Sequence, residues 1–307
     1  MRDIFHEKNI KLIEQAQKIP GKLPVAIVYP MNQAAIEGAI LAESLGLIHP
    51  IFIGPKEKMS QLAVGGNLNT YECIDESDPK LAAEKGVELV RAKKAFALLK
   101  GSLETSILLE AVLNKEKGIR GGRRISNCYI CDTPFYHKLL IYTDVGINIQ
   151  PDIKTKIDII LNACEVAHSI GIERPKIALL ACLEVVKENI PSTVDAETLC
   201  KMQKEGLFPN AIIEGPLSFD IAFSKEIAKI KGHLSQIAGD PDIAVFPDLD
   251  AGNIAVKQLE LFSDAQCGSL ALGAKVPILI TSRNTPAAER ALSCALAKLY
   301  MAKRKEN

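Results

Sequence analysis

Short apolar runs alternate with amphipathic segments along almost the whole chain. The run VAIVYP at 25–30 predicts a strand, and the segment NQAAIEGAILAESLG at 32–46 repeats apolar residues at helical spacing. The run HPIFIGP at 49–55 then predicts a second strand. A strand, a helix and another strand in this order are typical of parallel strands joined by crossover helices.

The same alternation continues to the C-terminus. Further strands are predicted over 95–101, 127–132, 138–147, 175–181, 210–216, 242–248 and 276–282. Further helices are predicted over 79–94, 106–118, 154–169, 195–205, 220–231, 253–262 and 286–303. One uninterrupted sheet of this kind is long for 307 residues. The pattern therefore favours an α/β protein with two α/β domains and a cleft between them as the default ligand site.

The composition is that of an ordinary globular protein, with 48% hydrophobic and 24% charged residues. The 37 basic residues balance the 37 acidic ones, which argues against a nucleic-acid-binding protein. The N-terminal segment is polar, unlike a secretory signal, and no apolar run reaches the roughly 18 residues that span a bilayer. The five histidines show no metal-ligand spacing. We expect a cytoplasmic protein with no metal site that binds neither nucleic acid nor membrane.

The segment VFPDLDAGN at 245–253 carries a predicted strand into a predicted helix. Asp250 or Asn253 is placed to cap that helix, and Gly252 lets the backbone approach a neighbour or a ligand closely. A helix N-terminus attracts anions, but the carboxylates of Asp248 and Asp250 repel a bare phosphate. The residues alone leave two interpretations open: turn and cap geometry, or contact with neutral donors on a ligand.

A second junction follows the last predicted strand. Ser282 and Arg283 fall at the strand tip, Thr285 is a good N-cap with Pro286 at the first helical position, and Glu289 lies one turn into the helix. A hydroxyl, a guanidinium and a carboxylate around one loop suit acyl or phosphoryl chemistry. Taken alone, the residue types favour a surface arginine and an acid that complements the helix dipole.

The segment KGIRGGRRIS at 117–126 holds three glycines and three arginines. Such a loop is able to cradle phosphate, although it lacks the G-x-x-x-x-G-K-[ST] pattern of a P-loop. An exposed basic connection explains the same composition equally well.

Six motifs together resemble the phosphate acetyltransferase and phosphate butyryltransferase family, closer to the butyryl branch. They are KG (100–101), NKEKGIRGGR (114–123), PSTVDAE (191–197), EGPLSFDIAFS (214–224), PDLDAGN (247–253) and GAKVPILITSR (273–283). Each motif is modest, but all six occur in the family's order, from residue 100 to the end of the chain.

The resemblance implies a reversible reaction in which acyl-CoA and phosphate give acyl phosphate and free CoA. It also implies an isocitrate dehydrogenase-like fold of two α/β domains, the first discontinuous (1–136 with 271–307) and the second formed by 137–270. Family members use no metal and no bound cofactor, since CoA or acyl-CoA is the substrate, and they are usually homodimers.

By the same resemblance, Ser282 stabilises the oxyanion that forms on the acyl carbonyl, and Arg283 binds the phosphate or acyl phosphate. Glu289 stands where the acetyl branch has an aspartate proposed to take the proton from the CoA thiol. The counterpart of PDLDAGN lines the cleft, which makes Asp248, Gly252 and Asn253 candidate substrate-binding residues.

One departure from the family pattern affects the expected phosphate site. Glu110 stands where family sequences have an arginine linked to phosphate binding, and an acid there repels the substrate. Our hypothesis from the sequence is that Arg120 and Arg123, in the 117–126 loop, take over this role.

Two other functions remain open from the sequence. Glu110 favours a catalytically weakened relative that binds CoA or acyl phosphate as a sensor or partner. A dehydrogenase on the shared fold is the other, but such enzymes usually need clustered aspartates for a divalent metal, and no G-x-G-x-x-G follows a strand here.

Overall fold

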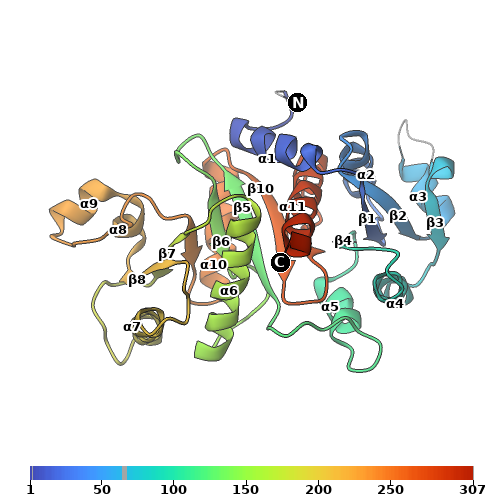
Figure 1. Ribbon diagram of the computed structural model, residues 1–307. Helices are drawn as coiled ribbons and strands as arrows, with labels where there is room; N and C mark the ends of the chain where they lie inside the picture. Colours follow the sequence, from blue (N-terminus) through green and yellow to red (C-terminus); the bar gives the residue numbers. More distant parts are fainter. Residues whose placement is uncertain (2, 64–67, 307) are drawn as a thin grey trace. The chain divides into compact units, whose positions relative to one another are not determined.

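A computed structural model describes residues 1, 3–63 and 68–306 and divides the chain into two compact units (Figure 1). Unit 1 comprises Met1–Arg124 and Cys267–Asn307, and unit 2 comprises Ile125–Gln266. The first unit is therefore discontinuous in sequence. The sequence-based divisions lie after residues 136 and 270, where the structure has them after 124 and 266.

Unit 1 is built on strands in the order β3-β2-β1-β4-β11-β10. Their bounds are β1 Leu23–Val28, β2 Ile48–Gly54, β3 Glu72–Asp75, β4 Leu98–Lys100, β10 Gln266–Leu272 and β11 Ile278–Leu279. All neighbouring pairs are parallel except β10 with β11. The chain runs outward from β1 to β3 and then returns to place β4 on the other side of β1. The sheet therefore has a topological switch point between β1 and β4.

Helices cover both faces of this sheet. Their bounds are α1 Glu7–Lys18, α2 Gln33–Ser44, α3 Lys56–Leu62, α4 Pro79–Arg91, α5 Thr105–Leu113 and α11 Ala287–Glu306, with a 3-10 turn at Leu68–Thr70. Helix α11 packs along α2 and against α1, whereas α4 packs against α5 (Figure 1). Because right-handed crossovers in opposite directions put their helices on opposite faces, α2 and α4 sandwich the apolar strand β1.

Unit 2 has strands in the order β5-β6-β9-β7-β8. Their bounds are β5 Ser126–Asp132, β6 Leu140–Thr143, β7 Lys176–Leu180, β8 Ile212–Leu217 and β9 Ile243–Val245. Strands β6, β9, β7 and β8 are parallel, and β5 is antiparallel to β6. The helices are α6 Ile153–Ser169, α7 Pro191–Lys204, α8 Phe219–Phe223, α9 Lys225–Ile230 and α10 Leu249–Phe262.

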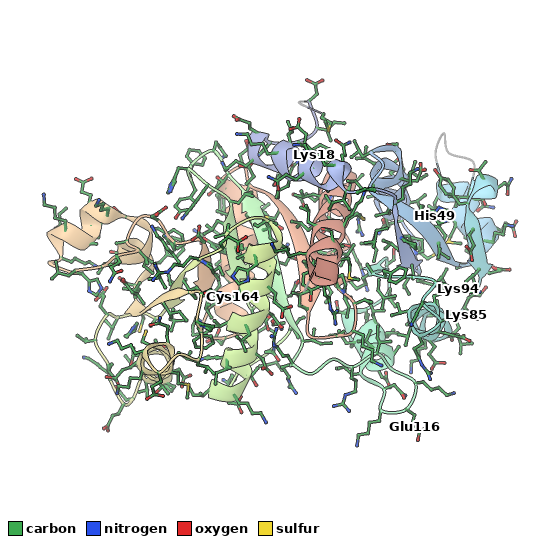
Figure 2. All side chains as sticks on the ribbon, viewed as in Figure 1. Lys18, His49, Lys85, Lys94, Glu116 and Cys164 are labelled. Atoms are coloured by element: carbon green, nitrogen blue, oxygen red, sulfur yellow. The ribbon has the colours of Figure 1, made fainter. Side chains whose placement is uncertain are left out.

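The core of each unit is formed by the apolar runs that predicted the strands. Strands β1 and β4 are almost entirely buried, and Cys164 lies in the interior of unit 2 on α6. Charged side chains such as Lys18, Lys94 and Glu116 point away from the elements that carry them, into solvent (Figure 2). None of the described helices combines the length and the apolar character needed to cross a membrane.

The predicted strands and helices are present, but the sequence missed strands β3 and β10 and helix α3. Two further differences are informative. The helix predicted over 220–231 is two helices, because Ser224 adopts an extended conformation and its hydroxyl accepts a hydrogen bond from the Ile227 N–H, which caps α9. Helix α10 begins at Leu249, four residues before the predicted start, so most of PDLDAGN is helical.

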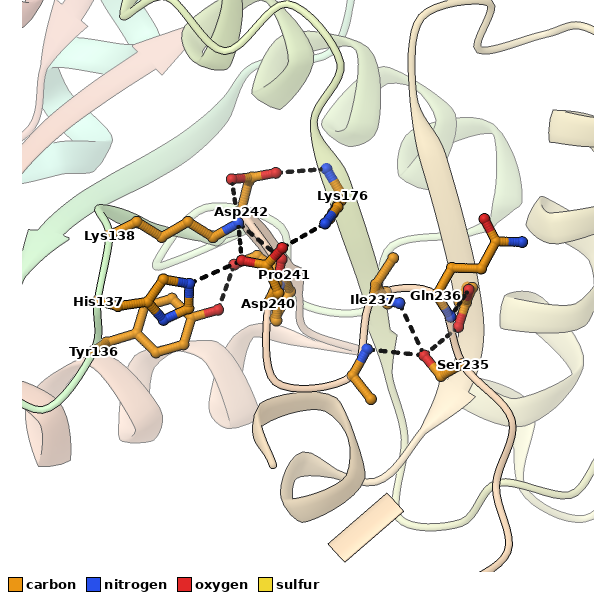
Figure 3. Close-up of polar contacts among 12 residues, drawn as sticks. Tyr136, His137, Lys138, Lys176, Ser235, Gln236, Ile237, Asp240, Pro241 and Asp242 are labelled. Carbon is orange, nitrogen blue, oxygen red and sulfur yellow. Dashed lines mark hydrogen bonds and ion pairs between the residues drawn. The ribbon is translucent and has the colours of Figure 1, made fainter. Parts of the chain in front are cut away.

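An ion-pair network joins the segments that precede β6 and β9 to Lys176, the first residue of β7 (Figure 3). The Asp240 carboxylate pairs with Lys138 and with His137, each at 2.8 Å, and with the Lys176 ammonium. Lys138 also pairs with Asp242 at 2.7 Å, and Asp242 accepts from the Lys176 N–H at 2.8 Å. The network lies at the N-terminal ends of the strands, the edge opposite to the one where ligands bind in such sheets, so its role is structural.

The pH dependence of stability tests this network. Burial alone would raise the pKa of the Asp240 carboxyl, but hydrogen bonds from Lys138, Lys176 and His137 hold that pKa well below its usual value. A carboxyl whose pKa is lowered by folding stabilises the folded state fully at a pH above its pKa in the unfolded chain, about 3.9. This stabilisation is lost as the pH falls through the lower pKa of the folded state. Because the groups are partly exposed, Asp240→Asn should lower the unfolding free energy by roughly 1 kcal/mol at pH 7.

Urea unfolding at pH 7, 5 and 3.5 measures the effect, and the difference between the two proteins should shrink toward the lowest pH. Glu197→Gln is the matched control, because Glu197 forms only an exposed i,i+4 pair with Lys201. An equal loss for Asp240→Asn at all three pH values would contradict the assignment.

Candidate active site

The switch point of unit 1 brings three loops to one edge of the sheet. Strands β1, β4 and β11 are parallel neighbours, so the loops at 29–32, 101–104 and 280–286 all leave from their carboxyl ends. The Gly101 N–H donates to the Val28 carbonyl at 2.8 Å, and the Asn32 side-chain amide donates to the Ser102 hydroxyl at 3.0 Å. Ligands of open α/β sheets bind at such a point.

Gly101 is needed for this close approach. A Cβ atom at this position would lie 2.4 Å from the Tyr29 carbonyl oxygen, far inside van der Waals contact. The KG motif of the sequence therefore has a structural reason: the glycine lets the loop after β4 pack directly on the loop after β1.

Ser282 and Arg283 lie at this edge, as predicted, in the loop between β11 and α11. The Ser282 side chain is half-buried and its hydroxyl donates to the Asn284 side-chain oxygen. Arg283 is exposed, and its guanidinium makes no hydrogen bond to any part of the chain that the structure describes. The Thr285 N–H donates to the Ser282 carbonyl at 3.2 Å, which closes the turn. Helix α11 begins at Ala287, one residue after the predicted first position, Pro286.

Arg290, on α11, holds this loop in place through hydrogen bonds. Its side chain is fully buried, and its guanidinium donates to the Ser282 carbonyl at 2.8 Å and to the Thr281 hydroxyl at 2.5 Å. It also donates to the Thr285 carbonyl at 3.1 Å and to the Lys100 carbonyl at 3.4 Å. Burial lowers the pKa of Arg290 to about 10, so the group remains a cation at neutral pH.

Lys100, the last residue of β4, is the third cation of this edge. It is only 4% exposed, and its ammonium donates to the carbonyls of Leu103 at 3.1 Å and Gly101 at 3.3 Å. Thr281 in turn donates its hydroxyl hydrogen to the Lys100 carbonyl at 3.2 Å. Lys100, Arg283 and Arg290 make this edge of unit 1 strongly positive.

Glu289 lies in the first turn of α11, half-buried. One of its carboxylate oxygens accepts a long hydrogen bond from the Cys267 N–H, 3.4 Å away, at the start of β10. The structure thus places the predicted general base on the same helix as Arg290, immediately before it in sequence, with one oxygen directed toward the backbone.

The loop at 117–126 lies elsewhere in unit 1. Arg120 forms a backbone bridge with Ala274, in the connection that precedes β11, whereas Ser282 follows β11. Gly121 packs so closely there that a Cβ atom would lie 2.1 Å from the Gly273 carbonyl oxygen. Arg120 is exposed and Arg123 is half-buried. The structure therefore places Arg120 at the end of β11 opposite to Ser282, and the loop's role in phosphate binding stays a prediction.

Glu110 does not lie among the three loops of the switch point either. It lines a groove of about 360 Å³ between α4 and α5, together with the cations Lys80, Arg91 and Lys117. Glu84 and Glu88 line the same groove, so its three carboxylates balance its three cations.

In unit 2, PDLDAGN forms the turn into α10. Asp248 is the N-cap, and its carboxylate accepts from the Ala251 N–H at 2.9 Å. The predictions of Asp250 or Asn253 as the cap were therefore wrong, because the helix begins earlier than its apolar pattern indicates. Gly252 is buried and Asn253 is exposed.

Gly252 has a strict steric role. A Cβ atom there would lie 2.4 Å from the Asp144 carbonyl oxygen, which belongs to the loop after β6. The Asp144 side chain is buried and accepts from the N–H groups of Asn127 at 2.7 Å and Asn148 at 2.8 Å. Burial raises the pKa of this carboxyl, and the hydrogen bonds oppose that effect. The glycine thus lets α10 pack directly on a rigid loop.

Sequence reasoning missed Lys100 and Arg290. The available signals were a lysine at the end of the apolar run AFALLK and an arginine inside the apolar helix pattern. No group of three or more His, Cys, Asp or Glu side chains suited to a metal ion occurs among the described residues.

Comparisons with known proteins agree with the motifs. The model of the family described as phosphate acetyl/butaryl transferase matches residues 78–297. A phosphate acetyltransferase from Rhizobium meliloti is 40% identical over 281 residues, 91% of this chain and 89% of that protein. A phosphate butyryltransferase from Clostridium acetobutylicum is 37% identical over 277 residues, 90% of this chain and 92% of that protein.

The fold agrees as well. The crystal structure of a branched-chain phosphotransacylase from Enterococcus faecalis V583 superposes with a TM-score of 0.78 at 31% identity, covering 91% of this chain and 98% of that one. The predicted isocitrate dehydrogenase-like α/β fold is thereby confirmed.

The close approach at Gly252 predicts a stability effect. Gly252→Ala should lower the unfolding free energy by about 1–3 kcal/mol, because α10 must shift away from the Asp144 carbonyl. Gly122→Ala is the control, since a Cβ atom at that position meets nothing within 4 Å. Urea unfolding followed by circular dichroism measures both, and equal stability of the two variants would show that the contact is not tight.

Proposed function

Because this chain belongs to the phosphate acetyl/butaryl transferase family, we propose that it transfers a short acyl group reversibly between CoA and inorganic phosphate. The chain covers about nine tenths of the length of the two relatives described above. We therefore propose the complete acyl-transfer reaction for this chain, and not a part of it.

The observation that carries the proposal is the positive edge at the switch point of unit 1. Ser282 and Arg283 lie where the topology favours a ligand, and Arg290 fixes the backbone of Ser282. A preorganised hydroxyl beside fixed positive charge suits a reaction in which an anion attacks a carbonyl and negative charge develops on oxygen.

In the direction of acyl phosphate formation, a phosphate oxygen attacks the thioester carbonyl carbon and the carbon–sulfur bond breaks. Ser282 donates a hydrogen bond to the carbonyl oxygen as it becomes an oxyanion, and Arg283 binds the phosphate. The CoA thiolate leaves and takes up a proton. No covalent intermediate with the protein is needed, because both substrates react directly with one another.

In the reverse direction, Glu289 accepts the thiol proton as sulfur attacks the acyl phosphate. Full proton transfer from a free thiol to a free glutamate costs roughly 6 kcal/mol, from ordinary pKa values of about 8.5 and 4.3. Transfer concerted with attack avoids most of that cost, since the sulfur loses its proton only as the new bond forms.

Further properties belong to the same proposal. We infer that the enzyme uses no bound cofactor, acts in the cytoplasm and forms a homodimer. The exposed apolar side chains of Ile254, Leu261 and Phe262 on α10 support self-association, because large apolar groups at a surface mark contact sites. The acyl group is butyryl, a branched chain or acetyl, and the Asp248–Asn253 turn is the candidate CoA-binding segment of unit 2.

A substrate panel tests the reaction. Acetyl-, propionyl-, butyryl- and isobutyryl-CoA are each incubated with the protein, with and without phosphate, and free thiol is measured. Phosphate-dependent thiol release with at least one of them is the expected result. Binding of CoA without any such release would instead favour a sensor or partner role.

Arg283→Ala should lower turnover at least a hundredfold while the protein stays folded, because a charge-assisted contact to the phosphate is lost. Arg120→Ala is the control, since its backbone pairs with Ala274, which precedes β11, whereas Arg283 follows β11. The Arg120 variant should keep its apparent affinity for phosphate. A phosphate defect in Arg120→Ala together with normal turnover in Arg283→Ala would place the phosphate at the 117–126 loop.

A further inference from the structure

Lys100 occupies a position where a charged side chain is costly. It ends the apolar strand β4, lies between β1 and β11, and is 4% exposed. Removing an ammonium from water costs several kcal/mol unless an opposite charge compensates it. A methionine or leucine would fill the same space without that cost, so the charge itself needs an explanation.

No such compensation comes from the residues that the structure describes. The Lys100 ammonium has three hydrogens, and its hydrogen bonds to the described residues go to two neutral carbonyls, those of Gly101 and Leu103. The charged groups acting on it are Arg290 from α11 and Arg283 from the preceding loop, and both are positive.

Arg290 is in a similar situation. Its acceptors among the described residues are three backbone carbonyls and the Thr281 hydroxyl, all neutral. Glu289 acts on Arg290 through space, but no carboxylate of the described chain lies within ion-pair distance of either Lys100 or Arg290. Two buried cations, Lys100 and Arg290, thus lie within electrostatic reach of each other and of the exposed Arg283, and together they are suited to an anion.

We propose that the Lys100 ammonium is a direct ligand of the anionic phosphoryl group of the substrate, acting together with Arg283 from the loop after the neighbouring strand β11. This proposal rests on the proposed function, because it assigns one more phosphate-binding residue to the same reaction. Lys100 reaches the site from β4, whereas Arg283 reaches it from the loop after β11. The two residues therefore hold the anion from separate segments.

A purely structural role makes a different prediction. If Lys100 served only to tie the 101–103 turn through its two carbonyl contacts, its replacement would change stability and leave anion binding and its pH dependence unchanged. The same is expected of Lys298, which is also 4% exposed and donates to a single carbonyl, that of Gly46, at 3.0 Å. Lys298 on α11 is therefore the matched control.

The ionisation of Lys100 gives the proposal a signature. Burial, and then the charges of Arg290 and Arg283, lower the pKa of Lys100 to about 8. As the pH rises through this value the free protein loses the charge, and an anion that needs it binds more weakly. A bound anion stabilises the charged form, so binding and protonation favour each other.

Inorganic sulfate is the probe, because it stays a dianion between pH 6.5 and 9 whereas phosphate titrates there. Isothermal titration calorimetry on the full-length protein gives the sulfate dissociation constant across this range. For the wild type the affinity should fall about tenfold between pH 6.5 and 9, following the loss of one proton from a group of pKa near 8.

Three variants decide the assignment. Lys100→Met should bind sulfate at least tenfold more weakly at pH 6.5, with little further change at pH 9. Lys100→Arg should keep affinity at pH 9, because a guanidinium stays charged there. Lys298→Met should behave as the wild type. Circular dichroism confirms that each variant is folded.

If the sulfate affinity of Lys100→Arg falls between pH 6.5 and 9 as steeply as that of the wild type, the proposal is overturned. This comparison remains decisive if Lys100→Met fails to fold. Sulfate affinity in a folded Lys100→Met equal to that of the wild type overturns it as well. The calorimetry needs no turnover. Absence of phosphate-dependent thiol release from the wild type would therefore refute the proposed function. The sulfate titrations would still show whether Lys100 binds an anion.

Discussion

The desolvated guanidinium of Arg290 is the interaction on which this site depends. It donates to the Lys100 carbonyl at the end of β4 and to three acceptors in the loop between β11 and α11, namely the Thr281 hydroxyl and the carbonyls of Ser282 and Thr285. A buried arginine without a carboxylate is expensive to keep, and it is tolerated here because every one of these contacts is a hydrogen bond. The loop that carries Ser282 is consequently tied to the core of unit 1 through Arg290, in addition to the contacts that its own side chains make.

This arrangement has a direct bearing on the chemistry. Electrostatic catalysis is effective when the charged groups are already in place before the reaction begins, since no reorganisation is then needed. Arg290 and Lys100 are both fixed by backbone carbonyls below the loop, while Arg283 remains exposed above it. The floor of the site is therefore rigid and positive, and the exposed arginine is the part that is free to adjust to the substrate.

The sequence predicted the strand and helix order well, because apolar periodicity reports burial and the parallel strands here are buried on both faces. It also located Ser282, Arg283 and the PDLDAGN turn. It did not show that Arg120 and Ser282 lie at opposite ends of β11, since that depends on the antiparallel pairing of β10 with β11. The Asp248 cap was missed because the first turn of α10 carries no apolar stripe. Lys100 belongs to the KG motif, but only the fold shows that it is buried and that no carboxylate among the described residues pairs with it.

Gly38, on α2, sets how closely α2 and α11 approach each other. A methyl group at this position would lie 2.7 Å from the Arg290 Cβ atom and 3.0 Å from the Ala287 carbonyl oxygen. Any larger residue would rotate or lift α11, and Glu289 and Arg290 would move together with it. Evolutionary change at this helix contact is therefore coupled to the reaction centre, because a glycine on α2 limits which acids and bases α11 is able to present.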